Sequence, residues 1–189
     1  SGLAAGSVPA VSGSIVVSLT RMNRILEIDT ENATVRAEAG AVTADLQGAV
    51  EKQGLFYPPD PSSTRHSTIG GNIACNAGGP RTVKYGATRD NVLSLTAVDG
   101  HGRLFHSSRP LGKLATGYNL TQLLVGSEGT LAVIVEATLR LHPLPQASRA
   151  LSASFRDVDA AALAVTRIMT QAVTPSALEF LDGKSLRLA

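Results

Sequence analysis

The stretch TIGGNIACNAGG, residues 68–79, decides how the rest of the chain is interpreted, because most of its twelve side chains are very small. Glycine permits backbone conformations with positive φ and lets another molecule approach the main chain without a Cβ in the way. Such a stretch is either a flexible linker or a loop that presses against a ligand. Two further glycine-rich stretches, SGLAAGS (1–7) and GSEGTLAVI (126–134), occur in the same chain. Consecutive exposed N–H groups in such turns form a concave site suited to a phosphate.

These three stretches do not carry the signatures of the common nucleotide-binding loops. None matches G-x-x-x-x-G-K-[ST], and none has G-x-G-x-x-G between a predicted strand and a predicted helix. A P-loop NTPase or a Rossmann-type NAD domain is therefore not the expected class. Three such stretches beside strongly strand-forming sequence nevertheless favour ligand-binding loops over linkers.

The composition is that of a globular protein. The chain has 189 residues, of which 43% are apolar and 17% charged, and its formal net charge is +2. This length corresponds to one domain, or to one domain and part of a second. With no Trp, three Tyr and four Phe, the chain lacks the basic and aromatic platform of a nucleic-acid-binding protein.

The sequence also argues against membrane-spanning and metal-binding classes. No apolar run approaches the roughly 20 residues needed to span a bilayer, and the first residues do not read as a signal peptide. The single cysteine excludes an internal disulfide and fits a reducing compartment, so a cytoplasmic protein is expected, with membrane association only through partner subunits. The four histidines lack the spacing of metal ligands, and no metal site is expected.

Apolar periodicity and capping residues predict the elements of the first 143 residues. They are a strand at 15–19, a hairpin of 24–29 and 33–40, a helix at 43–54 capped by Thr43 and Gly54, a second hairpin at 92–108, a short helix at 119–126 capped by Asn119 or Thr121, and a strand at 130–143. Between them, residues 55–91 show almost no periodicity. An irregular segment of that length inside a compact domain is usually either functional or disordered.

A proline-rich boundary at 143–146 separates this region from a different pattern. A strand at 150–155, a helix capped by Asp157 and a strand at 177–181 are expected after it. Such a unit leaves its sheet unfinished, so the C-terminus is expected to be cut short.

Four blocks of sequence carry a resemblance to a known family. GLFYPPDPSS (54–63), TIGGNIACNAGG (68–79), VKYGATRDNVLSL (83–95) and LLVGSEGTLAVIVEATLRL (123–141) resemble, in this order, the FAD-linked oxidases of the vanillyl-alcohol oxidase superfamily. The closest branch holds the D subunit of glycolate oxidase and the D-lactate dehydrogenases. The resemblance implies an α+β fold: a PCMH-type FAD-binding domain, with a mixed or antiparallel sheet and flanking helices, and then the start of a ferredoxin-like cap domain.

The resemblance also implies a division of the chain. Residues 1–146 would be the FAD-binding domain without its N-terminal subdomain, and residues 147–189 the incomplete beginning of the substrate or cap domain. SGLAAG (1–6) is similar to the end of the family's first pyrophosphate loop, whose leading glycines are missing here. The chain therefore looks truncated at both ends, and we expect it to be inactive on its own.

The cofactor-binding residues that the resemblance implies lie in all four blocks and at the N-terminus. Pro59 and Asp60 would lie near the flavin ring and the ribityl chain, whereas Glu128, Gly129 and Ile134 would hold the adenosine end. The remaining residues would contact the ribityl chain and the pyrophosphate or line the same groove: Gly2, Thr68, Gly70, Gly71, Asn72, Ala74, Gly78, Gly79 and Tyr85.

Several of these residues also have explanations that need no ligand. Tyr85 could be a packed surface aromatic, and Glu128 could cap the turn at Gly129. Asn72 and Asn76 could satisfy backbone groups of their own loop, as Asn often does. The single cysteine, within 68–79, is more often a small buried apolar residue than a reactive thiol.

By this resemblance the chain belongs to an FAD-dependent oxidoreductase of a D-2-hydroxy acid such as glycolate or D-lactate, with hydride transfer to flavin N5. The family's catalytic base and metal-binding histidines lie in the cap, so no catalytic residue is assigned here. The expected partners are the small substrate and an electron acceptor or sister subunits. The alternative is a non-catalytic flavin-binding or scaffold chain. A peptidoglycan-precursor reductase that uses NADPH is disfavoured, because NAGGPRTVKYG (76–86) and GSEGTLAVI (126–134) resemble the hydroxy-acid branch.

Overall fold

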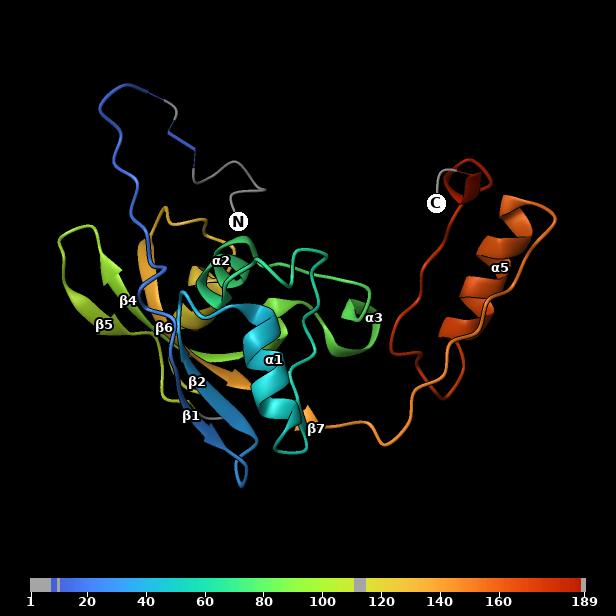
Figure 1. Cartoon of the computed structure of the whole chain (residues 1–189), viewed down its shortest axis with the longest axis horizontal. Helices are drawn as coiled ribbons and strands as arrows, with labels where there is room; N and C mark the ends of the chain where they lie inside the picture. Colours follow the sequence, from blue (N-terminus) through green and yellow to red (C-terminus); the bar gives the residue numbers. More distant parts are fainter. Residues whose placement is uncertain (1–7, 10, 111–114, 188–189) are drawn as a thin grey trace.

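The chain forms an antiparallel sheet with short helices against it and a C-terminal segment that stands apart (Figure 1). The computed structural model describes residues 8–9, 11–110 and 115–187. The predicted cofactor residue Gly2 lies outside the described residues.

The main sheet has five strands in the order β1-β2-β6-β4-β5. Their bounds are Ile25–Asp29 for β1, Thr34–Glu38 for β2, Val92–Asp99 for β4, Leu104–His106 for β5 and Ala132–Arg140 for β6. Each neighbouring pair is antiparallel. A separate pair joins β3 (Leu55–Phe56) to β7 (His142–Pro143). The two predicted hairpins are therefore confirmed, and the predicted strand at 130–143 is the central strand of the sheet.

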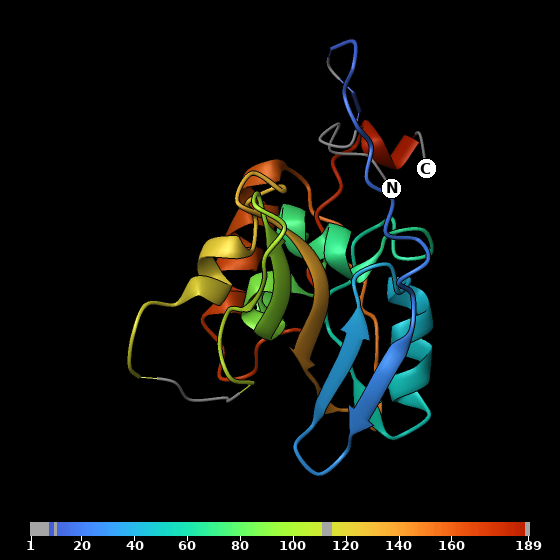
Figure 2. The same cartoon turned by 90° about the vertical axis from the view of Figure 1, so that its left-hand side faces the viewer.

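One face of this sheet carries the core. Strand β6 turns Ala132, Ile134, Ala137 and Leu139 inward, and all four are buried. The helices α1 (Thr43–Glu51), α2 (Ile69–Cys75) and α4 (Leu120–Leu124) contribute apolar side chains to the same cluster. In both views of the molecule, α1 lies on the side of the β1–β2 hairpin (Figures 1 and 2). The expected α+β arrangement with flanking helices is thus confirmed.

The long segment between β3 and β4 is ordered rather than irregular. Besides α2 it contains α3 (Thr82–Tyr85) and the 3-10 turn η1 (Thr88–Asn91). None of these short elements was predicted, because helices of only one or two turns are too short to show an apolar period. Helix α1 was predicted, but its N-cap is Val42, whereas Thr43 turns its buried side chain inward.

Three predicted strands are wrong. Residues 15–19, 150–155 and 177–181 form no strand in the structure. Their apolar side chains are largely exposed, as Val16 (60%) and Leu151 (98%) show. An alternating pattern becomes a strand only when a neighbouring strand completes its hydrogen bonds, and no described strand lies beside these segments.

The predicted C-terminal helix is confirmed. Helix α5 (Val158–Met169) begins after its N-cap Asp157, whose carboxylate accepts the N–H of Ala160 at 2.8 Å. Figure 1 shows α5 away from the main sheet, connected to β7 by an extended segment. The only other C-terminal element is the 3-10 turn η2 (Ser185–Arg187) within the described residues. The predicted boundary after residue 146 falls in this extended segment and stays a prediction.

Candidate cofactor site

The stretch 68–79 is a short helix anchored into the domain and not a linker. Thr68 is the N-cap of α2, and its hydroxyl accepts the N–H of Gly71 at 3.3 Å. The N–H groups of the next two residues bond to acceptors outside the helix. Ile69 donates to the carbonyl of Ala41 at 2.9 Å, and Gly70 donates to that of Ala39 at 2.7 Å. These bonds attach the N-terminal end of α2 to the segment that follows strand β2.

The glycines of this stretch lie in two different environments, and each explains the lack of a side chain in its own way. A Cβ on Gly70 would lie 2.6 Å from the Cβ of Ala39, and one on Gly79 would overlap Asp60. Both glycines therefore make room for the protein itself. By contrast, a Cβ on exposed Gly71 would meet only the Thr68 hydroxyl, at 3.2 Å, and one on Gly78 only the hydroxyl of a threonine of α3. Gly71 and Gly78 leave an open backbone surface.

A buried polar network lies beneath α2. The amide nitrogen of Asn72, a residue that is 3% exposed, donates to the hydroxyl of Thr43 at 2.7 Å. That hydroxyl is also 3.1 Å from both the carbonyl and the hydroxyl of Ser67. One N–H of the Asn72 amide is thus bonded within the protein, and the side-chain oxygen accepts no hydrogen bond from the described residues.

Pro59 and Asp60 lie in the loop that leaves strand β3. Gln47 of α1 holds this loop, because its amide donates to the carbonyl of Pro59 at 2.8 Å. Asp60 accepts the N–H of Arg81 at 3.2 Å and pairs with its guanidinium at 3.2 Å. Burial nevertheless raises the pKa of Asp60, against the lowering effect of Arg81, and the charge of Glu179 raises it further. Asp60 therefore braces the turn that contains Gly79.

The turn 126–129 packs against the other end of α2. Gly126 donates to the carbonyl of Ile73 at 2.9 Å, and Glu128 donates to that of Ala74 at 3.0 Å. Glu128 and Gly129 are exposed. Ile134 differs from them, since its side chain belongs to the core cluster and is 6% exposed. The turn thus continues the surface of α2, while Ile134 lies in the core of the domain.

Tyr85, at the end of α3, packs in an aromatic cluster. Its ring centroid is 5.5 Å from that of Phe56 and 5.4 Å from that of His142, both in edge-on geometry. The guanidinium of Arg81 lies 4.9 Å from the Phe56 centroid. Burial, with a smaller contribution from Arg140, lowers the pKa of His142. The tyrosine is half-buried, so this contact leaves part of its surface for a ligand.

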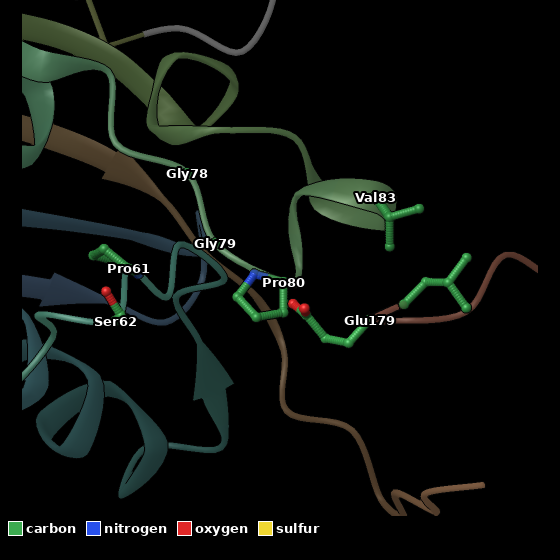
Figure 3. A pocket seen from close by; sticks show the side chains of 8 residues that line it. Pro61, Ser62, Gly78, Gly79, Pro80, Val83 and Glu179 are labelled. Atoms are coloured by element: carbon green, nitrogen blue, oxygen red, sulfur yellow. The ribbon is translucent and has the colours of Figure 1, made fainter. Parts of the chain in front are cut away.

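A shallow pocket of about 620 Å³ borders this region. Gly78, Gly79 and Pro80 form one side of it, and Leu178 and Glu179 of the C-terminal segment lie opposite (Figure 3). The carboxylate of Glu179 points toward Pro80 in this view. The glycine turn and the C-terminal segment therefore share one opening.

The structure places most of the predicted site residues in α2 and in the loops that flank it, some of them exposed and others buried. Around α2 it gathers Pro59, Asp60, Thr68, Gly70, Gly71, Asn72, Ala74, Gly78, Gly79, Tyr85, Glu128 and Gly129. The supporting residues Gln47 and Arg81 were not predicted, because no pattern in a single sequence reports a side chain that bonds to a distant loop.

This surface suits an extended anionic cofactor. Gly71 and Gly78 keep the backbone free of side chains, and the N–H of Gly78 makes no hydrogen bond within the described part of the chain. A free N–H beside an open glycine surface is the kind of donor that binds phosphate oxygens. In the described residues, no cluster of three or more His, Cys, Asp or Glu could hold a metal ion. None of the described helices is long and apolar enough to cross a membrane.

Two family models match the chain. The model described as "FAD binding domain" matches residues 1–108, and that described as "FAD linked oxidases, C-terminal domain" matches residues 144–189. The chain therefore belongs to the family of FAD-linked oxidases, and its cofactor is FAD. The expected FAD-binding fold, followed by the start of the C-terminal domain, is confirmed.

Individual relatives narrow this class. The chain is 47% identical over 184 residues to glycolate oxidase subunit GlcD of Bacillus subtilis, covering 97% of this chain and 39% of that protein. It is 41% identical to the D-lactate dehydrogenase of Anaerostipes hadrus, covering 96% of this chain and 38% of that protein. It is 42% identical to the D-2-hydroxyglutarate dehydrogenase of Stutzerimonas stutzeri, covering 98% and 39%. The chain thus spans about two fifths of the length of these relatives.

A solved structure of alkyldihydroxyacetonephosphate synthase matches the fold with a TM-score of 0.61 and 34% identity. The match covers 68% of this chain and 23% of that one.

Proposed function

We propose that this chain forms the FAD-binding part of an oxidoreductase of D-2-hydroxy acids such as glycolate or D-lactate. The relatives support this substrate class, because their names state glycolate, D-lactate and D-2-hydroxyglutarate. The non-catalytic alternative gains no support from them, since they are named as oxidases and dehydrogenases. FAD supplies the hydride acceptor of such a reaction when bound, because N5 of its ring takes the hydrogen that leaves the substrate's α-carbon.

The observation that carries the proposal is the open backbone surface at Gly71 of α2 and at Gly78, three residues after its end, together with the bonds of α2 to the turn 126–129. In this proposal the pyrophosphate and the ribityl chain lie along Gly71, Ala74 and Gly78. The oxygen of Asn72, which accepts no bond from the described residues, would accept a hydrogen bond from the ribityl chain.

The two ends of the cofactor fall on the two flanking loops. Pro59, Asp60 and Tyr85 contact the ring end, and Glu128 and Gly129 contact the adenosine end. Since Asp60 is paired with Arg81, its role is to hold the loop in shape rather than to move a proton. Thr68, Gly70 and Gly79 shape the site, and a contact from the core residue Ile134 stays a prediction.

The proton of the substrate hydroxyl requires a base, and no residue described here is assigned to that task. We propose that the base and the carboxylate-binding groups come from the C-terminal domain, of which Leu178 and Glu179 line the same pocket as Gly78 and Gly79. We also propose sister subunits or a protein electron acceptor as partners, as the name of the Bacillus relative, a subunit, suggests. A cytoplasmic location is part of the same proposal.

A valine scan of two helical glycines tests the cofactor surface. Gly71→Val places a branched side chain on the open face of α2, and overpacking of this kind corresponds to a roughly tenfold to hundredfold rise in the Kd for FAD. Gly48→Val is the matched control, because Gly48 is also helical and has nothing within 4 Å of its Cβ position. FAD titration followed by flavin fluorescence measures both. Equal affinity in the two variants would exclude this surface as the site.

The substrate class is tested separately on the full-length protein loaded with FAD. Glycolate, D-lactate and D-2-hydroxyglutarate are each offered with an artificial dye as electron acceptor, with L-lactate as the control. We expect dye reduction with at least one of the three and none with L-lactate. A flavin-loaded protein that oxidises none of them would contradict the proposed activity while leaving FAD binding intact.

A further inference from the structure

The turn 126–129 has an unusual backbone that needs support. Gly126, Glu128 and Gly129 have φ values of +83°, +51° and +80°. Glu128 has a side chain, so its left-handed conformation is held by the surroundings and not by its own preference. Two main-chain bonds attach the turn to α2, at the carbonyls of Ile73 and Ala74. By themselves, these two bonds would attach the turn only to one end of a seven-residue helix, so the turn needs further support.

Arg89 of η1 connects this turn to the rest of the site. Its guanidinium donates to the carbonyl of Gln122 at 3.0 Å and to that of Val125, the residue before the turn, at 2.8 Å. Gln122 returns a bond, because its side-chain amide donates to the Arg89 carbonyl at 3.0 Å. The N–H of Arg89 donates to the side chain of Asn76, the C-cap of α2, at 2.9 Å. One residue thus holds the approach to the turn and the end of α2 together.

The geometry requires an arginine rather than any cation. Among the described residues, Arg89 takes part in no ion pair, so its charge is used on backbone carbonyls. A planar guanidinium can bond two carbonyls in fixed directions, whereas a lysine ammonium is a single point at the end of a flexible chain. A Cβ on Gly126 would lie 3.3 Å from the guanidinium, so the turn and the arginine already touch.

We propose that Arg89 is a positioning residue that fixes the turn 126–129 against α2 and thereby sets the affinity for the adenosine half of FAD. This inference rests on the proposed function, in which Glu128 and Gly129 contact the adenosine end. FMN lacks that half, so its binding does not depend on the turn. The role belongs to cofactor selection and does not place Arg89 in contact with the reacting atoms.

The test is the variant Arg89→Met, compared with wild type and with Arg103→Met. Arg103 also braces a turn, through Asp99 in the β4–β5 hairpin, but lies outside the site. Each protein is titrated with FAD and with FMN, and hydrogen exchange of the Gly126 and Glu128 amides is measured without flavin. Loss of two charged hydrogen bonds predicts a roughly tenfold to hundredfold weaker FAD affinity and a similar acceleration of exchange. FMN affinity should change less than about twofold.

Further variants make the result interpretable. Arg89→Lys should recover little of the FAD affinity, because one ammonium group cannot replace the planar guanidinium that bonds two carbonyls in fixed directions. Gln122→Met, which removes only the returning bond, should shift FAD affinity in the same direction by a smaller factor, and it serves if Arg89→Met does not fold. Equal losses for FAD and FMN, or unchanged exchange at both amides, would overturn the proposal. If wild type binds neither flavin, the proposed function fails, whereas the exchange experiment still decides whether Arg89 holds the turn.

Discussion

The helices α2 and α5 are held in opposite ways. Helix α2 has seven residues with two consecutive glycines, and its N-terminal N–H groups, its polar side chain Asn72 and its last carbonyls all bond to other segments. Helix α5 has twelve residues, four of them alanine or leucine in its first half, and only Ala161 is buried. Tertiary contacts therefore stabilise α2, whereas the helix preference of its own residues stabilises α5.

This difference shows where function is to be sought. Two glycines in a helix cost about 2 kcal/mol relative to alanine, so a sequence tolerates them only for a compensating reason. In α2 the reasons are close contact between Gly70 and Ala39 and the open surface at Gly71. Helix α5 obeys every local rule and carries no candidate site residue. The segment that departs from local preference is the one that forms the cofactor surface.

The largest expected effect is on stability, when a methyl group is added to each of two helical glycines, Gly70 and Gly48. Gly70→Ala pushes a Cβ to 2.6 Å from that of Ala39, and we expect it to destabilise the domain by about 1–3 kcal/mol despite the better helix propensity of alanine. Gly48→Ala in α1, with nothing within 4 Å of its Cβ, should instead stabilise by up to about 1 kcal/mol. Urea denaturation of the FAD-free protein measures both. A stabilised Gly70→Ala variant would show that α2 is not pressed against the segment after β2.

An effect of similar size is expected for the polar network under α2. Asn72→Ala removes a buried hydrogen bond to Thr43 and leaves space behind it, which should cost about 1–3 kcal/mol of unfolding free energy even without cofactor. Asn32→Ala, on an exposed turn where the amide bonds Asp29, should change stability by about 0.5 kcal/mol or less. If Asn72→Ala alters FAD affinity but not the stability of the FAD-free protein, Asn72 serves the ligand and not the fold.

Much of the fold follows from sequence alone, for physical reasons. The hairpins around 24–40 and 92–108 show the two-residue alternation of a sheet with one buried face, and α5 has a capping aspartate and a 3.6-residue period. The strands expected at 15–19, 150–155 and 177–181 do not form, because a strand needs a neighbouring strand to complete its hydrogen bonds. Alternation alone does not report whether that partner is present.

The candidate site is predictable only as a set of loops. The glycine-rich stretches and their family resemblance identify α2 and the turn 126–129, but not which glycines face the protein. Gly70 and Gly71 are neighbours with equal sequence evidence, yet a Cβ on Gly70 would press against Ala39, whereas one on Gly71 would meet only the Thr68 hydroxyl. The bonds of Arg89 to carbonyls 33 and 36 residues away likewise depend on the assembled fold.

The smallest expected effect comes from removing the N-cap side chains of α5 and α2. Asp157→Ala removes the carboxylate that accepts the N–H of Ala160, and we expect α5 to lose about 1 kcal/mol locally. Amide hydrogen exchange within α5 should accelerate several-fold, while the unfolding midpoint of the main sheet stays unchanged, because α5 buries almost nothing against it. Thr68→Ala removes the corresponding cap of α2. Its exchange should change less, because the N–H groups of Ile69 and Gly70 keep their bonds to Ala41 and Ala39. If α2 frays more than α5, its order comes from local capping and not from the contacts that also shape the cofactor surface.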